Sequence, residues 1–338
     1  MALGGRVEAL LQRHWWRPRP SWLSIALSPL SWVYRALSAL ARRRHAEPAP
    51  VPVVVVGNLV AGGAGKTPTV VALIESLQAA GWHPGVVSRG HGSRHDGTLA
   101  VELQTDVRDC GDEPLLIRRR SSVPVWVGRW RADAARALCA AHPEVDLLVA
   151  DDGLQHAALA RTLEIVVFDE RGVGNGRLLP AGPLREPMPT RWPETRLVLY
   201  NATKPSTSAP GALAERRPGA VQTLADWRNR SKEHVASIET LRGRRLLAAA
   251  GIASPERFFS MLEDAGLEID RLPLPDHARF DALPWPASTP EVVVTEKDAV
   301  KIDPARLGKT MVWVVGLDFR LPTDFVQAVL QRLARRPS

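Results

Sequence analysis

The residues best suited to bind phosphate lie in a glycine-rich stretch early in the chain. The sequence GNLVAGGAGKTP covers residues 57–68 and follows the β-branched run Val53–Val56. Glycines let backbone N–H groups approach phosphate oxygens, and the N-terminus of a following helix attracts anions. A strand, a glycine-rich turn and a helix that starts near Lys66 are the context that a phosphate-binding loop requires. The sequence therefore predicts a nucleoside triphosphate site.

The glycine spacing of this loop departs from the usual pattern. In G-x-x-x-x-G-K-[ST] the first glycine would stand at Val60 of this chain. The cluster GGAGKT at 62–67 resembles instead the G-G-x-G-K-[ST] loops of deviant phosphate-loop ATPases. Those loops carry a further lysine, which would fall at Ala61 and is absent here. A chance glycine-rich turn is the alternative interpretation.

Carboxylates and a histidine elsewhere could complete a phosphotransferase. The apolar run at 146–150 ends in Asp151 and Asp152, as is typical of a Walker B site whose carboxylates reach Mg²⁺ or its waters. Asp112, in the sequence CGDEP, could accept a proton from a substrate hydroxyl. His277 follows much later, in the sequence PDH. A turn, a helix N-cap and a structural histidine are the respective alternatives.

The composition narrows the class of protein. The 338 residues carry a formal net charge of +8, and 45% of them are hydrophobic, enough for a sizeable core. Only six of the 44 basic residues are lysine, and no nucleic-acid-binding pattern accompanies the charge, so we expect no nucleic-acid partner. The charge fits an anionic membrane surface or a phosphorylated substrate. Two cysteines, Cys110 and Cys139, indicate a reducing, cytoplasmic setting.

The first element that the sequence predicts is an N-terminal amphipathic helix. Between Ser21 and Arg42 the polar residues recur every three or four positions and form one narrow stripe, while the rest is rich in Trp and Leu. Pro29 is expected to bend or break the helix. We favour a helix that lies in a membrane interface, with arginines at the headgroups. A helix packed on the protein core, a transmembrane helix and a secretory signal are the alternatives.

Beyond residue 50, short apolar runs alternate with helical patterns. This order predicts an α/β fold with a phosphate-loop NTPase-like, doubly wound and mostly parallel sheet, in which ligands bind at the carboxyl ends of the strands. The expected helices cover residues 66–80, 113–120, 131–141, 255–265 and 324–335. The expected strands cover residues 51–56, 85–88, 123–128, 146–150, 164–168, 197–200, 246–250, 291–295 and 311–315.

A Pro- and Ser-rich stretch after residue 200 divides this series in two. We therefore expect a membrane-interfacial helical segment at 1–45 and a nucleotide-binding core at 46–200. A linker at 201–240 and a smaller C-terminal α/β domain at 241–338 would follow.

Eight motifs resemble one family closely. The chain is identified by them as a member of the tetraacyldisaccharide 4′-kinase family, whose enzymes phosphorylate a lipid A precursor in Gram-negative bacteria. The Val60 spacing is typical of that family, while His91 and Ala278 are small departures from its pattern. The motifs are GNLVAGGAGKTP (57–68), SRGHG (88–92), GDEP (111–114), DDGLQH (151–156), GNGRLLPAGPLRE (174–186), AGIASPERFF (250–259), PDH (275–277) and TEKDAVK (295–301).

The resemblance implies a kinase that uses ATP and Mg²⁺ to phosphorylate the 4′-hydroxyl of a tetraacyldisaccharide 1-phosphate. Lys66 would neutralise the β- and γ-phosphates, and Thr67 would ligate Mg²⁺. The resemblance implies nucleotide contacts from Val60, Ala61, Gly62, Gly63, Ala64, Gly65, Lys66 and Thr67.

The resemblance also implies the remaining site residues. Glu113, Asp151 and Asp152 are the further candidates for Mg²⁺ ligands. Asp112 and His277 would accept the proton of the 4′-hydroxyl, so the two domains must close to assemble the site. Arg185 would stabilise charge, with a solvated surface arginine as the alternative. The TEKD segment at 295–298 is expected near the nucleotide or the domain cleft.

The resemblance implies that the protein acts at the cytoplasmic face of the inner membrane. Its partners would be the lipid A precursor and an anionic membrane surface, with no obligate protein partner. One alternative function is a membrane-associated phosphate-loop ATPase switch, against which the missing lysine at Ala61 and the acid at Asp112 argue. Another is a soluble ligase that resembles dethiobiotin synthetase, in which the N-terminal helix would have no function.

Overall fold

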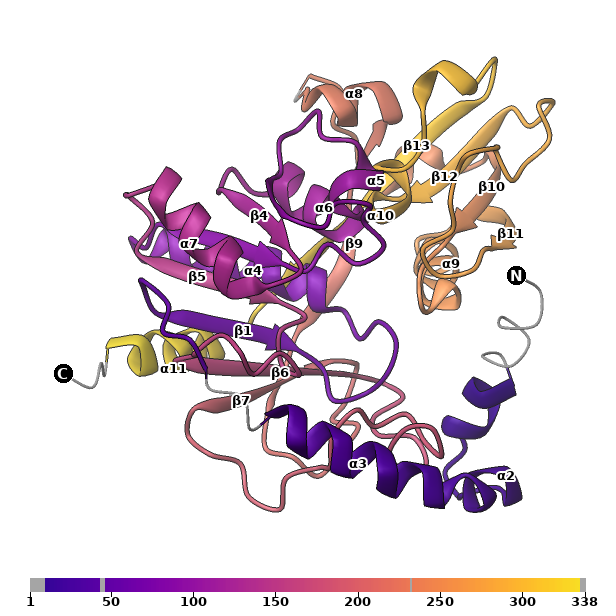
Figure 1. The fold of residues 1–338 in the computed structure, drawn as a ribbon. Helices are drawn as coiled ribbons and strands as arrows, with labels where there is room; N and C mark the ends of the chain where they lie inside the picture. Colours follow the sequence, from indigo (N-terminus) through magenta and orange to yellow (C-terminus); the bar gives the residue numbers. More distant parts are fainter. Residues whose placement is uncertain (1–9, 43–45, 232, 335–338) are drawn as a thin grey trace.

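Two β-sheets with helices packed on them lie next to each other in the molecule (Figure 1). The computed structural model describes residues 10–42, 46–231 and 233–334. Within these residues the first sheet has eight strands and the second has five. Both sheets are mostly parallel, so the predicted α/β fold class is confirmed.

The first sheet has the order β3-β4-β2-β5-β1-β6-β7-β8, and β3 is its antiparallel member. β1 lies between β5 and β6, where the strand order reverses, and its four consecutive valines are buried on both faces. Ligands bind at the carboxyl ends of strands near such a reversal. The strands are β1 (Val53–Gly57), β2 (Pro84–Ser88), β3 (Thr98–Ala100), β4 (Val125–Gly128), β5 (Leu147–Asp151), β6 (Leu163–Asp169), β7 (Arg196–Asn201) and β8 (Ala212–Leu213).

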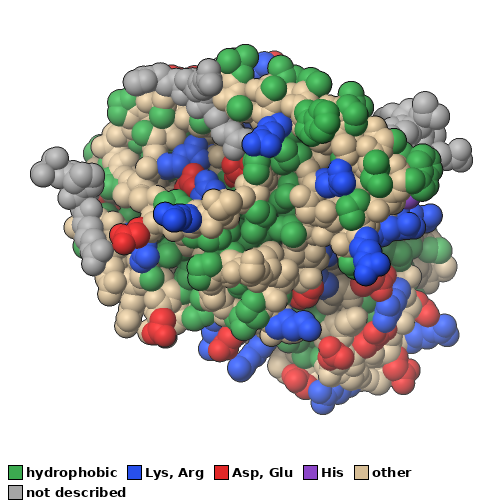
Figure 2. Space-filling view, turned by 90° about the horizontal axis from the view of Figure 1, so that it is seen from below, with side chains coloured by type: hydrophobic (Ala, Val, Ile, Leu, Met, Phe, Trp, Pro, Cys, Tyr) green, Lys and Arg blue, Asp and Glu red, His purple; other side chains and the backbone are tan. Residues whose placement is uncertain are grey.

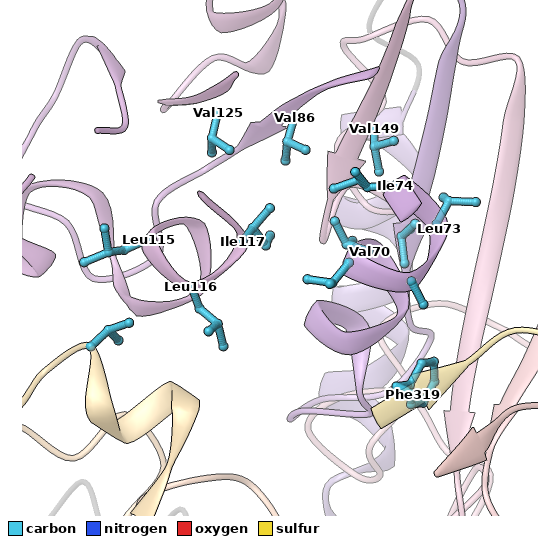
Figure 3. Close-up of a cluster of buried hydrophobic side chains, with 14 of the residues drawn as sticks. Val70, Leu73, Ile74, Val86, Leu115, Leu116, Ile117, Val125, Val149 and Phe319 are labelled. Carbon is cyan, nitrogen blue, oxygen red and sulfur yellow. The ribbon is translucent and has the colours of Figure 1, made fainter. Parts of the chain in front are cut away.

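Helices cover this sheet and close its hydrophobic core. Val70, Leu73 and Ile74 of α4 pack near Val86 and Val149 of the sheet (Figure 3). The same cluster includes residues of α6 and of the second sheet, so one apolar core runs through both parts of the molecule. The helices are α4 (Lys66–Ala79), α5 (Val107–Cys110), α6 (Asp112–Arg120) and α7 (Arg131–Ala141).

The second sheet has the order β11-β10-β12-β13-β9, with β9 antiparallel to β13. Its helices include α10, which follows β12 directly and contacts α6 of the first domain. The strands are β9 (Glu215–Thr223), β10 (Arg245–Ala250), β11 (Glu268–Pro273), β12 (Glu291–Thr295) and β13 (Met311–Arg320), and the helices are α8 (Leu224–Asn229), α9 (Pro255–Asp264), α10 (Glu296–Ala299) and α11 (Thr323–Ala334).

The division between the two parts differs from the predicted segments. The stretch 201–240, expected to be a linker, contains β8, β9 and α8. Its β9 pairs with β13 as an edge strand, where Pro and charged residues are tolerated because one side of the backbone needs no partner strand. At the other end of the chain, α11 returns to contact α4 and β6 of the first domain.

The N-terminal helix is interrupted before Pro29 and packs with its polar side inward. α2 (Trp22–Ala26) ends at the cap residue Leu27, and α3 (Ser28–Arg42) follows at once. Ser31 exchanges hydrogen bonds with the backbone of Leu178 and Ala181, at 2.9 and 3.2 Å. The serine stripe therefore faces the segment 174–186, and α3 runs along the lower edge of the molecule (Figure 1).

The apolar side of α2 and α3 is exposed. Seen from below, hydrophobic side chains gather on the face that carries α3 (Figure 2). We call this the α2–α3 apolar face. None of the helices in the described ranges is long and apolar enough to cross a membrane. The face consists of Trp22, Ile25, Leu30, Trp32, Val33, Leu37 and Leu40, each more than half exposed.

Candidate active site

The phosphate-binding loop joins β1 to α4 and requires glycine at its end. Gly65 caps α4 with a φ of +89°, and a Cβ there would lie 1.9 Å from Nδ2 of Asn201. Asn201 donates to the carbonyl of Ala64, and Arg171 donates to the carbonyl of Gly63, at 3.0 and 2.8 Å. The first N–H groups of α4 have no partner within the helix. The loop and this helix end therefore suit an anion.

Lys66 and Arg185 converge on one carboxylate. Lys66 Nζ lies 3.6 Å from Asp152 Oδ1, and Arg185 Nη1 donates to the same oxygen at 3.2 Å. Arg185 also donates to Oε1 of Gln155 at 3.2 Å. Burial alone would raise the pKa of Asp152, but the charges of Lys66, Arg185 and a further buried arginine, Arg131, lower it. The predicted residues Lys66, Asp152 and Arg185 thus form one contact group.

Asp151 ends β5 and is completely buried beside this group. Its Oδ2 accepts a hydrogen bond of 3.4 Å from Ser88, while its Oδ1 has no hydrogen-bond partner among the described residues. Burial, followed by the negative charges of Glu113 and Asp152, raises the pKa of Asp151 to about 7. A bound cation would give Oδ1 a partner and would lower this raised pKa, because it compensates the buried negative charge.

The donor set fits a magnesium ion that shares its ligands with a nucleotide. Mg²⁺ prefers oxygen, retains several waters, and binds one or two carboxylates together with substrate phosphates. Asp151 offers the unpartnered Oδ1, and Thr67, at the start of α4, offers a hydroxyl. In the described part of the chain, no cluster of three or more His, Cys, Asp or Glu side chains could hold a metal by itself. Such an ion would therefore depend on phosphate oxygens as further ligands.

Asp112 and His277 form a second contact group, across the two domains. Asp112 begins α6, and His277 lies in a turn after β11. His277 Nδ1 lies 3.1 and 3.0 Å from the two carboxylate oxygens of Asp112. Burial favours the neutral acid, yet the hydrogen bond from His277 and the charges of Lys297 and Lys301 hold the pKa of Asp112 well below its usual range. The same hydrogen bond raises the pKa of His277.

The start of α6 separates two openings between the domains. Glu113, Lys66 and Thr67 line a cavity of about 200 Å³ on one side. Asp112 and His277 line a cleft of about 950 Å³ on the other. Among the described residues, no ion pair or hydrogen bond joins Asp112 or His277 directly to Lys66. The two groups are linked instead through the neighbouring residues of α6.

Comparison with known proteins decides the family. A family model described as "Tetraacyldisaccharide-1-P 4'-kinase" matches residues 23–334. A protein named tetraacyldisaccharide 4'-kinase from Methylibium petroleiphilum is 52% identical over 97% of this chain and 94% of its own. Another of that name, from Leptothrix cholodnii, is 50% identical over 98% of both chains.

The chain belongs to the tetraacyldisaccharide-1-phosphate 4′-kinase family. The predicted family, enzyme class and function are thereby confirmed, and the activity is phosphoryl transfer to the 4′ position of a tetraacyldisaccharide 1-phosphate. The fold also agrees with the crystal structure of LpxK from Aquifex aeolicus, determined in complex with ATP. That structure has a TM-score of 0.73 and 22% identity, and it covers 92% of this chain and 99% of its own.

Within this kinase fold, the structure adds four residues to those predicted from sequence. Arg131 donates to the carbonyls of Asp151 and Asp152 at 3.0 and 2.8 Å, and Gln155 accepts from Arg185. Lys297 and Lys301 lie beside Glu113 and Asp112, at 3.0 and 3.7 Å. Gln155 and both lysines stand inside recognised motifs, and the scarcity of lysine was a further signal. Arg131 has no comparable signal, because it is simply the first residue of an ordinary alanine-rich helix.

Proposed function

We propose that this 4′-kinase uses ATP with Mg²⁺ and binds the nucleotide at residues 60–67. Lys66 carries the positive charge that meets the transferring phosphoryl group, and Arg185, which contacts the same oxygen of Asp152, adds a second positive charge. Bound Mg²⁺ would neutralise charge on the β- and γ-phosphate oxygens, held by Thr67 and Asp151 with Asp152 and Glu113 as further ligands. The contact group of Lys66, Asp152 and Arg185 supports this assignment.

We further propose that Asp112 and His277 together accept the proton of the 4′-hydroxyl. The observation that carries this proposal is the short contact between the two side chains across the domains. Asp112 faces Nδ1 of the imidazole, which leaves the lone pair on Nε2 as the proton acceptor. A neutral imidazole held in this way is a stronger base than a free one, because the carboxylate stabilises the cation that forms.

We propose that the α2–α3 apolar face lies in the interface of an anionic membrane. Tryptophans and leucines project outward from it while the serines bond to the protein, the reverse of a helix packed on a core. Arg35, exposed on α3, could meet anionic headgroups. The acceptor lipid would then be taken directly from the membrane.

We propose the cytoplasmic face of the inner membrane as the location. Both cysteines are free thiols, which agrees with a reducing compartment. No obligate protein partner is needed in this account, since one chain supplies the phosphate-binding loop, the acids and His277. The lipid A precursor is the acceptor.

Transfer of labelled γ-phosphate from ATP to a tetraacyldisaccharide 1-phosphate in mixed micelles tests the proposed reaction. We expect label at the 4′ position, only with Mg²⁺ and only with the lipid present. Lipid-independent release of inorganic phosphate, without labelled lipid, would favour the ATPase switch instead. Flotation with anionic vesicles tests the membrane proposal separately.

A further inference from the structure

The segment 295–301 connects the second domain to the start of α6. Its two lysines, Lys297 and Lys301, have no function in the proposed reaction. It follows β12, a central strand of the second sheet, and forms α10. Glu296 binds Arg120 of α6 at 2.7 Å. Lys297 Nζ lies 3.0 Å from Glu113 and 3.4 Å from Asp276. The segment therefore reaches both acids of the GDEP motif, since Lys301 approaches Asp112.

Asp298 is a fixed anion within this segment. Its side chain is completely buried. Its Oδ2 accepts hydrogen bonds from the backbone N–H of Gly251 at 3.0 Å and from the hydroxyl of Thr295 at 2.7 Å. Its other oxygen, Oδ1, lies 2.9 Å from Lys301 Nζ. A buried carboxylate is costly without such partners, so Asp298 and Lys301 depend on each other.

Lys301 extends this arrangement to the proposed base. Its side chain is 7% exposed, and its Nζ lies 3.7 Å from Oδ2 of Asp112. The ammonium also lies over the ring of Phe280, 5.4 Å from the centroid, which limits where it can move. Asp298, Lys301, Asp112 and His277 therefore form an alternating series of charges from the second sheet to the imidazole.

We propose that Lys301, held by Asp298, is a positioning residue for phosphoryl transfer that fixes the Asp112 carboxylate against Nδ1 of His277. The inference rests on the proposed function, because it concerns the same base. The ammonium and the imidazole both approach Oδ2 of Asp112, at 3.7 and 3.0 Å, while Oδ1 accepts from the backbone N–H of Glu113 at 3.0 Å, so these partners together favour one orientation of the carboxylate. Lys301 touches neither nucleotide nor lipid in this account, and it acts through Asp112.

A purely structural function of Lys301 predicts a different result for the variants. If Lys301 only neutralised Asp298, the exchange Asp298→Asn would make the lysine unnecessary. If it positions Asp112, removing both charges restores the stability of the fold but not the turnover. The pair of exchanges therefore separates the two explanations.

The test compares Lys301→Met, Lys301→Met/Asp298→Asn and the control Lys309→Met, an exposed lysine of the same domain. We expect kcat to fall by order 10²-fold in Lys301→Met, with the KM for ATP unchanged, since misplacing a group by about 1 Å costs this much. The double variant should regain the thermal midpoint of the wild type and stay slow. Lys309→Met should have wild-type kinetics.

Three results would overturn the inference. They are wild-type kcat in Lys301→Met, wild-type kcat in the double variant, and a raised KM for ATP with kcat unchanged. If Lys301→Met does not fold, the kcat of the double variant relative to the wild type is the test. Failure of the proposed function is a separate outcome, because wild-type protein would then transfer no phosphate to the lipid in the same assay.

Discussion

Two residues of the candidate site adopt backbone conformations that L-amino acids rarely adopt. Asp152 has a φ of +46° and His277 a φ of +56°, and Arg230 is the third non-glycine residue with positive φ in the described chain. Such conformations cost free energy and persist where the surroundings enforce them. Asp152 is held by Lys66 and Arg185, and His277 by Asp112. The strain supports a functional assignment for both residues.

Removing Lys66 should abolish most of the turnover. In Lys66→Ala the transferring phosphoryl group loses a preorganised cation, so we expect kcat to fall by about 10²-fold or more. Lys204→Ala, at an exposed position, serves as the matched control. Steady-state kinetics with ATP and the lipid in micelles provide the measurement. Wild-type turnover in Lys66→Ala would contradict the phosphate-binding loop.

The rate should depend on the protonation of His277. Its pKa is raised above the ordinary value of 6.5, chiefly by the hydrogen bond to Asp112. A base must be neutral to accept a proton, so kcat should fall as the pH drops below this raised pKa.

The variant Asp112→Asn checks the sign of this effect. It removes the negative charge that raises the pKa of His277, so the acid limb of the kcat profile should move to lower pH. The profiles of the two proteins are compared at saturating ATP. An acid limb at the same pH in both would show that another group controls the rate.

At the scale of elements, the sequence predicts interior strands and misses edge strands. Every expected strand lies in the structure within a few residues, and β3, β8, β9 and β11 were not expected. These four are the edges of the two sheets in the described chain. Interior strands are buried on both faces and form continuous apolar runs, whereas the edge sequence ERRPGAVQT of β9 does not.

The candidate site could also be predicted only in part from the sequence. Motifs identify the loop, the acids and His277, because their residue types and spacing carry chemistry. The contacts of Lys297 and Lys301 depend on how α10 docks against α6, which no local pattern encodes. The orientation of α3 is likewise not encoded in a local pattern. Its serine stripe faces the protein because residues 174–186 fold so that their backbone meets the serines.

The α2–α3 apolar face should determine membrane binding. Trp32→Glu and Leu37→Glu leave the serine contacts intact but remove a large apolar side chain from the interface. Burial of such a side chain contributes about 1.5–3 kcal/mol, so each variant should bind anionic vesicles about 10- to 100-fold more weakly. Val235→Glu, at an exposed apolar position on the second domain, is the control. Equal vesicle binding by all variants would contradict the interfacial assignment.

At the scale of the whole molecule, the two domains build one site. The nucleotide loop and Asp112 belong to the first domain, while His277, Lys297 and Lys301 belong to the second. Apolar contacts between α4 and β13, and the ion pair of Arg120 with Glu296, hold the two parts together. Turnover should therefore depend on contacts that join the domains, even where these contacts lie outside the nucleotide loop.

The central claim is that Asp112 and His277 act as one proton acceptor across this boundary, and a double-mutant cycle tests it most directly. A positioned base contributes about 10²–10⁴-fold, so kcat should fall by such a factor in Asp112→Ala and in His277→Ala. Residues that act as a unit are not additive, so the double variant should be little slower than either single one. Nucleotide affinity should change little in all three. Losses that multiply in the double variant, or loss of ATP binding in Asp112→Ala, would contradict the account.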